Sequence, residues 1–278
     1  MKHRIIADSC CDLTPNMKKD MGIVSIPLTM TFGDKEFCDD ECLDMDGYMD
    51  EMRSYSGKPS SASPSPHLYQ EAIEATNEAF IITLSSKLSG SYNNAVIGNN
   101  QAEEETGNGA VFIFDSKTAA AGETLIALKL HEMIRAGVSN EGIVEKVNRF
   151  IDGMKTYFVL EKYDNLQKNG RLRKITSSLF HLLNIKLIMG ADGNGEIALY
   201  EKCKGIKSAI KQFLSLIENS GKETRNENLV ITHCNNRKLA EQLAMLIKDR
   251  FDFREVFIVP TGGLSSLYVD EKGIVIAF

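Results

Sequence analysis

The stretch AFIITLSSKLSGSYNNA at residues 79–95 decides the fold, because an apolar run leads through serines and glycine into a segment that suits a helix. Two similar runs, RIIADS at 4–9 and VFIFDS at 111–116, also end in serine. After the last of these runs, apolar residues recur at helical spacing, at Ile126, Leu130, Met133 and Ile134. This alternation predicts an N-terminal α/β domain whose parallel sheet is covered on both faces.

The second half of the chain, from about Thr156, has a different pattern. Strand-like segments occur at 156–163, 182–190 and 195–203, and ADGNG at 191–195 predicts a turn that makes the last two strands antiparallel neighbours. Helical periodicity follows at 206–218 and 238–250, and further strands are expected in NLVITHC, REVFIVP and GIVIAF. We therefore expect two domains, residues 1–152 and 153–278, the second an α/β domain with a mixed or antiparallel sheet and helices on one side.

Composition narrows the class of protein. The 278 residues carry 32 Lys and Arg against 38 Asp and Glu, and no basic run is long enough to follow a nucleic acid backbone. The N-terminus lacks the apolar core of a signal peptide, and no segment approaches the roughly 20 apolar residues of a membrane span. The sequence thus predicts a cytoplasmic protein without nucleic acid partners or stable membrane insertion.

The six cysteines form no CxxC pair and no Cys/His spacing suited to zinc. We interpret them as reduced, mostly buried thiols. Cys10 and Cys11 follow a strand and lie close to Asp8 in the sequence, and a neighbouring carboxylate disfavours a reactive thiolate. No metal or cofactor is therefore expected.

The segment KPSSASPSP at 58–66 contains three prolines and four serines, with no apolar residue larger than Ala62. Proline stiffens the chain, and each serine hydroxyl both donates and accepts a hydrogen bond. Composition alone leaves two interpretations open: an exposed linker, or a rigid loop that presents Ser61 and Ser63 to a ligand.

A second serine group, Ser85, Ser86, Ser89 and Ser91, stands where the strand at 79–84 leads into a helix. Ser89 suits the N-cap of that helix. The same turn also offers free N–H groups, a favourable dipole and hydroxyls to an anion. The other strand ends add Ser9 and Ser116 at the sheet edge where ligands bind in open α/β sheets.

Asp8 and Asp115 end two of these strands. A carboxylate is a poor partner for an anion, so we expect both to anchor loops by accepting backbone N–H groups. The alternative is a carboxylate pair that holds Mg²⁺ for phosphoryl transfer.

Cations concentrate in one place, EKYDNLQKNGRLRK at 161–174, where an Asn169-Gly170 turn precedes Arg171, Arg173 and Lys174. Such a run is usually a solvated face, whereas a rigid Arg beside a cleft suits carboxylate or phosphate. An apolar helix is expected to follow in SSLFHLL at 177–183.

Signals for catalysis are missing from the sequence. His233 ends a strand, where a lone histidine is more often structural. No serine lies in a G-x-S-x-G elbow, and neither common nucleotide-binding loop occurs. We expect no catalytic residues.

Five segments, in order and spread over the whole chain, resemble the successive motifs of the DegV family: ADSCCDL at 7–13, PSSASP at 59–64, SSKLSGSYNNA at 85–95, FDSKTAAAG at 114–122 and YDNLQKNGRL at 163–172. The resemblance implies two α/β domains that enclose a long-chain fatty acid, with its tail in a tunnel and its carboxylate on loop hydroxyls. It also implies a carrier role in a two-component fatty acid kinase, whose separate ATP-binding subunit phosphorylates the bound acid.

Carried over by residue, the resemblance places Ser61 at the family's loop threonine and Ser89 at its turn serine. Arg171 keeps the arginine of the family's Gly-Gly-Arg turn, as a head-group or partner contact. Ser63 and Ser91 complete the candidate hydroxyls, although Ala62 and Ser63 replace the serine and glutamine common in the family loop, so one amide contact is lost.

The C-terminal segment TGGLSSLYVDEKG at 261–273 departs from the family, which usually has a histidine before a Gly-Pro-Gly turn. Tyr268 stands about where that histidine would lie, and a phenol donates one hydrogen bond to a carboxylate. The leading interpretation is a non-enzymatic fatty acid carrier. The alternatives are an Mg²⁺-dependent phosphotransferase using Asp8 and Asp115, and a regulatory protein stabilised by its ligand.

Overall fold

The computed structural model describes residues 4–76, 78–107, 109–176, 179 and 184–278. The N-terminal half is built on a four-stranded parallel sheet in the order β2-β1-β6-β7. Its strands are β1 (Arg4–Asp8), β2 (Val24–Ile26), β6 (Glu78–Thr83) and β7 (Ala110–Asp115). The three apolar runs thus form the predicted parallel strands, and the three-residue β2 is an addition at the edge.

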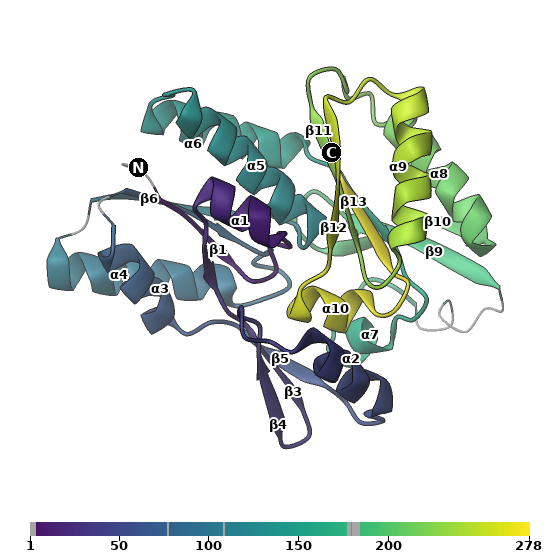
Figure 1. The fold of residues 1–278 in the computed structure, drawn as a ribbon, viewed down its shortest axis with the longest axis horizontal. Helices are drawn as coiled ribbons and strands as arrows, with labels where there is room; N and C mark the ends of the chain where they lie inside the picture. Colours follow the sequence, from purple (N-terminus) through teal and green to yellow (C-terminus); the bar gives the residue numbers. More distant parts are fainter. Residues whose placement is uncertain (1–3, 77, 108, 177–178, 180–183) are drawn as a thin grey trace.

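Helices cover both faces of this sheet, as expected (Figure 1). Side chains alternate along β1, so Ile5 packs under α1, α5 and α6, while Ile6 packs under α3 and α4. The helices are α1 (Pro15–Met21), α3 (Pro66–Glu74), α4 (Ser91–Thr106), α5 (Ala121–Arg135) and α6 (Asn140–Gly153). The predicted stripe on α5 is confirmed, because Ile126, Leu130 and Met133 are buried against the sheet.

A small antiparallel sheet, β4-β3-β5, and the helix α2 (Met45–Ser54) project from the N-terminal half (Figure 1). Its strands are β3 (Thr29–Phe32), β4 (Lys35–Cys38) and β5 (Ser60–Ala62). The last lies inside the Ser/Pro segment, so the linker interpretation is wrong: Ser61 pairs with Met30. Pro59 and Pro64 lie just outside this edge strand, where a missing N–H breaks no ladder.

The C-terminal half contains a six-stranded sheet in the order β10-β9-β8-β13-β11-β12. Only β11 and β12 run parallel, so the sheet is mixed, as predicted. Residues 192–196 form the turn between antiparallel β9 and β10, one residue later than predicted, because Ala191 still pairs with Ile197. The strands are β8 (Thr156–Val159), β9 (Ile185–Ala191), β10 (Ile197–Lys204), β11 (Asn228–His233), β12 (Glu255–Pro260) and β13 (Ile274–Ala277).

The predicted helices α8 (Gly205–Asn219) and α9 (Arg237–Arg250) cover one face of the mixed sheet. The opposite face turns toward the N-terminal half, where α5 contacts β11 and β13 as well as β1 and β6 (Figure 1). Two short helices, α7 (Asp164–Lys168) and α10 (Gly263–Val269), lie beside this junction. Helix α5 therefore connects the two sheets through one buried layer.

Three further predictions need comment. The division of the chain at residue 152 stays a prediction, and α6 runs to Gly153. The helix expected at 177–183 lies outside the described residues, except for Leu179. Among the described residues, no helix is long and apolar enough to cross a membrane.

Candidate functional site

The serines at the strand ends meet at one edge of the parallel sheet, but the protein backbone occupies their hydroxyls. Ser9 Oγ accepts the Leu28 N–H at 3.0 Å, and Ser85 Oγ donates to the Gly195 carbonyl at 2.7 Å. Ser116 Oγ donates to the Thr118 carbonyl at 3.2 Å. All three serines are buried. They hold loops in place, which corrects the expectation that they would face a ligand.

The strand-end carboxylates anchor the neighbouring loops, as expected. Asp8 accepts the N–H groups of Cys10 at 3.2 Å and Leu84 at 2.9 Å, one on each oxygen. Asp115 Oδ1 accepts the N–H groups of Ser86 and Lys117, each at 3.1 Å. Burial raises the pKa of Asp8 to about 6. Among the described residues, no three His, Cys, Asp or Glu side chains are arranged so that they could hold a metal ion.

Cys10 and Cys11 are free, buried thiols. Burial raises the pKa of both well above the ordinary value, and the nearby Glu123, Asp8 and Asp12 carboxyls raise it further. Both thiols therefore stay protonated, which agrees with the unreactive role expected for them.

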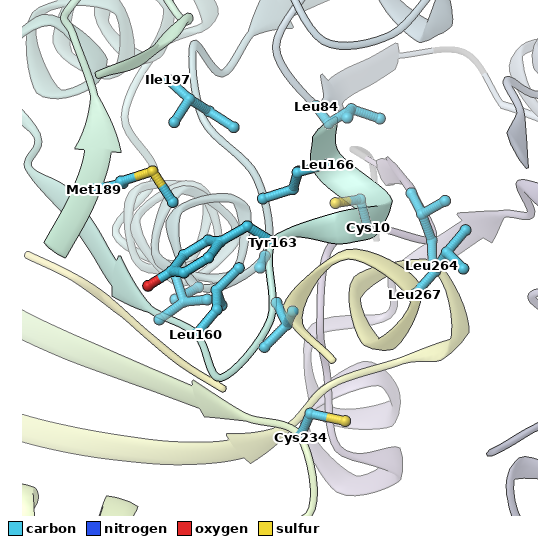
Figure 2. Close-up of a cluster of buried hydrophobic side chains, with 14 of the residues drawn as sticks. Cys10, Leu84, Leu160, Tyr163, Leu166, Met189, Ile197, Cys234, Leu264 and Leu267 are labelled. Carbon is cyan, nitrogen blue, oxygen red and sulfur yellow. The ribbon is translucent and has the colours of Figure 1, made fainter. Parts of the chain in front are cut away.

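A cavity of about 340 Å³ lies between the two sheets. This volume falls in the range of small-molecule sites, about 300–1,000 Å³. Its wall is mainly apolar, and it includes Leu28, Leu84, Phe158, Leu160, Leu264 and Val275. Figure 2 shows how Leu84 and Cys10 from the N-terminal half gather with Leu160, Leu166 and Ile197 from the C-terminal half. Both halves of the chain therefore build the cavity.

Five predicted site residues line this cavity together, and we call them the cavity mouth: Ser61, Ser63, Ser89, Arg171 and Tyr268. The Ser61 and Tyr268 hydroxyls are 2.8 Å apart and hydrogen-bonded. The Arg171 guanidinium carbon stands 5.8 Å from the centre of the Tyr268 ring. Residues more than 200 positions apart in sequence thus form one polar rim, whose role in ligand binding stays a prediction.

Two mouth residues, Ser61 and Ser63, are held in place by contacts with neighbouring elements. Pairing with β3 fixes Ser61, and Asn94 Nδ2 donates to Ser63 Oγ at 3.1 Å. Gly90 brings the turn against this loop, because a Cβ on Gly90 would lie 3.1 Å from Ser63 Oγ. The close approach between loop and turn therefore favours glycine at this position.

Two serine predictions need correction. Ser91 is fully buried and absent from the cavity wall, and its hydroxyl bonds to Ser89 Oγ at 3.0 Å. The N-cap of α4 is Gly90, not Ser89. Ser89 Oγ still accepts the N–H of Ser91 at 3.2 Å. Ser89 therefore satisfies the first N–H donor of α4, although it lies one residue before the N-cap.

Arg171 follows the predicted turn, in which Gly170 takes a φ of 73°. Its Nε donates to the Leu88 carbonyl at 3.2 Å, and its Nη1 donates to the Asn169 carbonyl. These bonds hold the guanidinium against the turn that carries Ser89. The solvated-face interpretation therefore fits Arg173 and Lys174, which are exposed, but not the half-buried Arg171.

Helix α10 carries Tyr268 and part of the cavity wall, and sequence reasoning missed it. Two carboxylates from the N-terminal half hold its start. Asp39 accepts the N–H groups of Gly263 at 2.8 Å and Leu264 at 2.9 Å, and Asp12 accepts the Gly262 N–H at 2.8 Å. Nothing local in the sequence signals these long-range caps.

The apolar cavity wall was also missed, although one signal for it exists. Along β8, Tyr157 and Val159 pack under α8 and α9, whereas Phe158 between them faces the cavity. This period of two identifies the inner face of the strand. His233, by contrast, has the structural role expected for it: its Nδ1 accepts the Asn236 N–H at 3.4 Å, and burial lowers its pKa.

Comparisons with known proteins agree with this architecture. The DegV family model matches residues 2–278. A DegV domain-containing protein from Streptococcus pneumoniae is 34% identical over 280 residues, which cover 100% of this chain and 99% of that protein. The crystal structure of a DegV family protein from Ruminococcus gnavus, refined with vaccenic acid, superposes with a TM-score of 0.96 at 37% identity and covers 100% of both chains.

A further solved structure is the Fatty Acid Kinase (Fak) B3 protein of Streptococcus pneumoniae, loaded with linoleic acid. It is 33% identical, with a TM-score of 0.92, and the match covers 100% of this chain and 99% of that one. Family model, sequence relatives and solved structures agree over essentially the full length, so this chain belongs to the DegV family.

Proposed function

We propose that this protein binds a long-chain fatty acid, with the acyl tail in the cavity and the carboxylate at the cavity mouth. The observation that carries the proposal is one mainly apolar cavity on which the Ser61, Ser89 and Tyr268 hydroxyls and the Arg171 guanidinium gather; the polar side chains that also line it are Lys117, Thr118, Thr156, Glu196 and Ser265. This polarity matches an amphiphile with a single anionic end. Similar DegV proteins crystallised with vaccenic and linoleic acid support the same ligand class.

The mouth has the chemistry that a buried carboxylate needs. Removing an ion from water costs several kcal/mol unless hydrogen bonds replace the lost hydration. Hydrogen bonds to a charged group contribute about 1.5–3 kcal/mol each. Ser61 and Tyr268 share one hydrogen bond, so this pair offers one free O–H, and Ser89 offers a second hydroxyl. Arg171 adds a fixed positive charge. Together these groups are of the right order to offset desolvation of the head group.

The tail supplies the larger share of the affinity. Each methylene that leaves water for an apolar wall contributes about 0.8 kcal/mol. The hydroxyls therefore orient the ligand and select an acid over an alcohol or hydrocarbon, while the wall sets binding strength.

In the same proposal, the chain is the non-catalytic carrier for a separate kinase subunit. A carboxylate oxygen forms a bond to the terminal phosphorus of ATP held by that subunit, while the bond to the bridging oxygen breaks and ADP leaves. The carrier's residues bind and orient the carboxylate. The similarity to a Fatty Acid Kinase (Fak) B3 protein supports this role.

Mass spectrometry of lipids extracted from the denatured, purified protein tests the ligand class. We expect long-chain acids in an amount close to that of the protein. Leu88→Trp, which fills the cavity at its mouth, should lower this amount, whereas Leu246→Trp on the exposed face of α9 should not. Several lipid-free preparations that also take up no added fatty acid would contradict the proposal.

The carrier role has its own test. The isolated chain should not turn over ATP, and acyl phosphate should form only when ATP and a fatty acid kinase subunit are added. ATP turnover by the chain alone, lost in Asp115→Asn, would instead identify an Mg²⁺-dependent phosphotransferase. If no mixture makes acyl phosphate but ligand removal alters partner binding, the protein is a ligand-stabilised regulator.

A further inference from the structure

Polar side chains line the cavity at places other than its mouth, and most of them already have partners. The Lys117 ammonium lies 2.7 Å from the Asp152 carboxylate, and the Glu196 carboxylate pairs with Lys174. Ser265 Oγ lies 3.5 Å from a backbone carbonyl. Two threonine hydroxyls in the same wall remain without a role in the fatty acid site described above.

These two threonines come from both halves of the chain and meet in the cavity wall. Thr118 follows β7, Thr156 begins β8, and their buried hydroxyls are 2.8 Å apart. One O–H group makes this bond. Among the described residues, the other has only the Ala119 carbonyl, 3.5 Å from Thr118 Oγ1, whereas good O–H···O bonds span about 2.5–3.0 Å. The pair therefore holds a donor that its own surroundings leave largely unused.

The segment that carries Thr118 is held in an unfavourable backbone conformation. Lys117 has a φ of 54°, and Ala120 combines a φ of 53° with a ψ of -120°, values that residues other than glycine rarely adopt. Gly122 completes the arrangement, because a Cβ there would lie 2.4 Å from Thr118 Oγ1. Backbone strain of this kind persists only where the surrounding structure enforces it, and it is concentrated at ligand sites. The strained segment thus fixes the Thr118 hydroxyl at the cavity wall.

The sheet fixes the second hydroxyl. Along β8, Thr156 and Phe158 line the cavity, whereas Tyr157 between them packs on the opposite face. The neighbouring strand β9 approaches closely, because a Cβ on Gly190 would lie 2.2 Å from the Thr156 carbonyl oxygen. Both hydroxyls are therefore held by rigid backbone, which is what a binding subsite requires.

We propose that Thr118 and Thr156 form a subsite for a hydroxyl group on the acyl chain, so that the ligands of this protein include hydroxy fatty acids. The inference rests on the proposed function, because the acyl chain must occupy the cavity to reach this pair. Among the described residues, neither threonine hydroxyl bonds to a residue of the cavity mouth. The subsite is therefore separate from the groups proposed to hold the carboxylate, and it meets the tail.

Hydrogen bonding gives the pair its selectivity. Methylene groups form no hydrogen bonds, so an unsubstituted tail makes no use of the free donor. A tail hydroxyl that lies against the apolar part of the wall loses its bonds to water without replacement, which is costly. Beside the two threonines, the same hydroxyl both donates and accepts. The subsite therefore selects the position of a hydroxyl along the chain.

The experiment measures, by calorimetry on the delipidated whole chain, a series of hydroxystearic acids that differ only in the position of the hydroxyl. Because these isomers have the same composition, differences in affinity report where the hydroxyl lies. We expect one position to bind about tenfold more tightly than the weakest isomers. Thr156→Val keeps the shape of the side chain without its hydroxyl and should reduce this preference to within about twofold. Thr156→Ser keeps a hydroxyl and should retain the preference.

Thr232→Val is the matched control. Thr232 is buried and lies outside the cavity wall, and among the described residues its hydroxyl has no hydrogen-bond partner. This variant should keep the preference within about twofold of the unmodified chain. If Thr232→Val abolishes the preference as Thr156→Val does, the effect is one of general packing, and the inference is overturned.

Stearic acid, measured on the same protein, separates this inference from the proposed function. If stearic acid binds but the isomers bind equally, or if their preference survives Thr156→Val, the inference fails while the proposed function stands. If the unmodified chain binds neither stearic acid nor any isomer, both fail. Should Thr156→Val bind no stearic acid because it does not fold, Thr118→Val removes the other hydroxyl and is judged by the same loss of preference.

Discussion

Two polar clusters lie at the junction of the two sheets, and their chemistry is opposite. The first, the acidic anchors, consists of Asp8, Asp12, Asp39 and Glu123, which are buried. The second is the cavity mouth, which offers hydroxyls and the Arg171 guanidinium. Asp8, Asp12 and Asp39 accept the protein's own N–H groups, Glu123 is buried beside them without a hydrogen-bond partner among the described residues, and the mouth faces open volume.

The difference explains where an anion can bind. Burial raises the pKa of Asp12 to about 7 and that of Glu123 well above its ordinary range, and Asp8 raises the latter further. Carboxyls in such surroundings resist ionisation, and a ligand carboxylate placed beside them would meet the same penalty plus repulsion. The mouth has donors in place of acids. The carboxyl groups of the acidic anchors are thus buried away from the cavity mouth, which offers hydroxyls and a guanidinium.

The sharpest way to break this comparison is to remove an anchor. Asp39→Ala leaves the N–H groups of Gly263 and Leu264 without acceptors at the start of α10. Each buried unsatisfied donor costs about 1–3 kcal/mol, so we expect the free energy of unfolding to fall by about 4 kcal/mol. Because α10 carries Tyr268, fatty acid affinity should fall as well. Urea unfolding followed by circular dichroism, with ligand titration, measures both.

Asp34→Ala is the control, because Asp34 is an exposed carboxylate in the turn between β3 and β4. We expect a change of no more than about 0.5 kcal/mol. If the two variants unfold at the same urea concentration, Asp39 is not an anchor, and the distinction between the clusters fails.

The second test uses pH. Burial raises the pKa of Asp12 from 3.8 to about 7, so the folded protein keeps a proton that the unfolded chain releases. The contribution of the protonated Asp12 to the free energy of unfolding is at its full value below about pH 4, and it is lost as the pH rises to about 7. From pH 5 upward the loss is about 3 kcal/mol, because each pKa unit corresponds to about 1.4 kcal/mol. Asp12→Asn keeps an acceptor for the Gly262 N–H and removes the titration.

Thermal melts at pH 5 and pH 8 measure this effect. The unmodified protein should lose more stability over this interval than Asp12→Asn, and Asp8 and Glu123 should contribute to the slope that remains. A variant that loses as much stability as the unmodified chain would show that Asp12 is ionised in the folded state.

The sequence alone predicted those elements that carry a clear apolar periodicity of their own. Strand β6 and helix α8 each carry an apolar pattern long enough to identify type and buried face. It was insufficient for β5, in which three residues, two of them serines, are held only by pairing with β3. It was equally insufficient for α10, whose glycines suggest a turn until distant Asp39 and Asp12 cap it.

The candidate site divides in the same way. Motif order brought Ser61, Ser89 and Arg171 together, and the structure places all three on one cavity. The sequence could not distinguish structural hydroxyls from cavity hydroxyls. Ser85 and Ser89 stand four residues apart, and only the hydrogen-bond partner of each reveals its role. That partner, the Gly195 carbonyl for Ser85, comes from the other half of the chain. For the same reason, the sequence does not distinguish a leucine that lines the cavity from one that packs in the core.

This contrast between Ser85 and Ser89 gives the test with the smallest expected effect. Ser61→Ala and Ser89→Ala should each weaken fatty acid binding by about 1.5 kcal/mol, roughly tenfold, with little change in Tm. Ser85→Ala should lower Tm instead, because it leaves the buried Gly195 carbonyl without its donor. If Ser89→Ala lowers Tm and leaves affinity unchanged, its bond to the Ser91 N–H is its whole function, and Ser89 belongs with the structural serines rather than at the mouth.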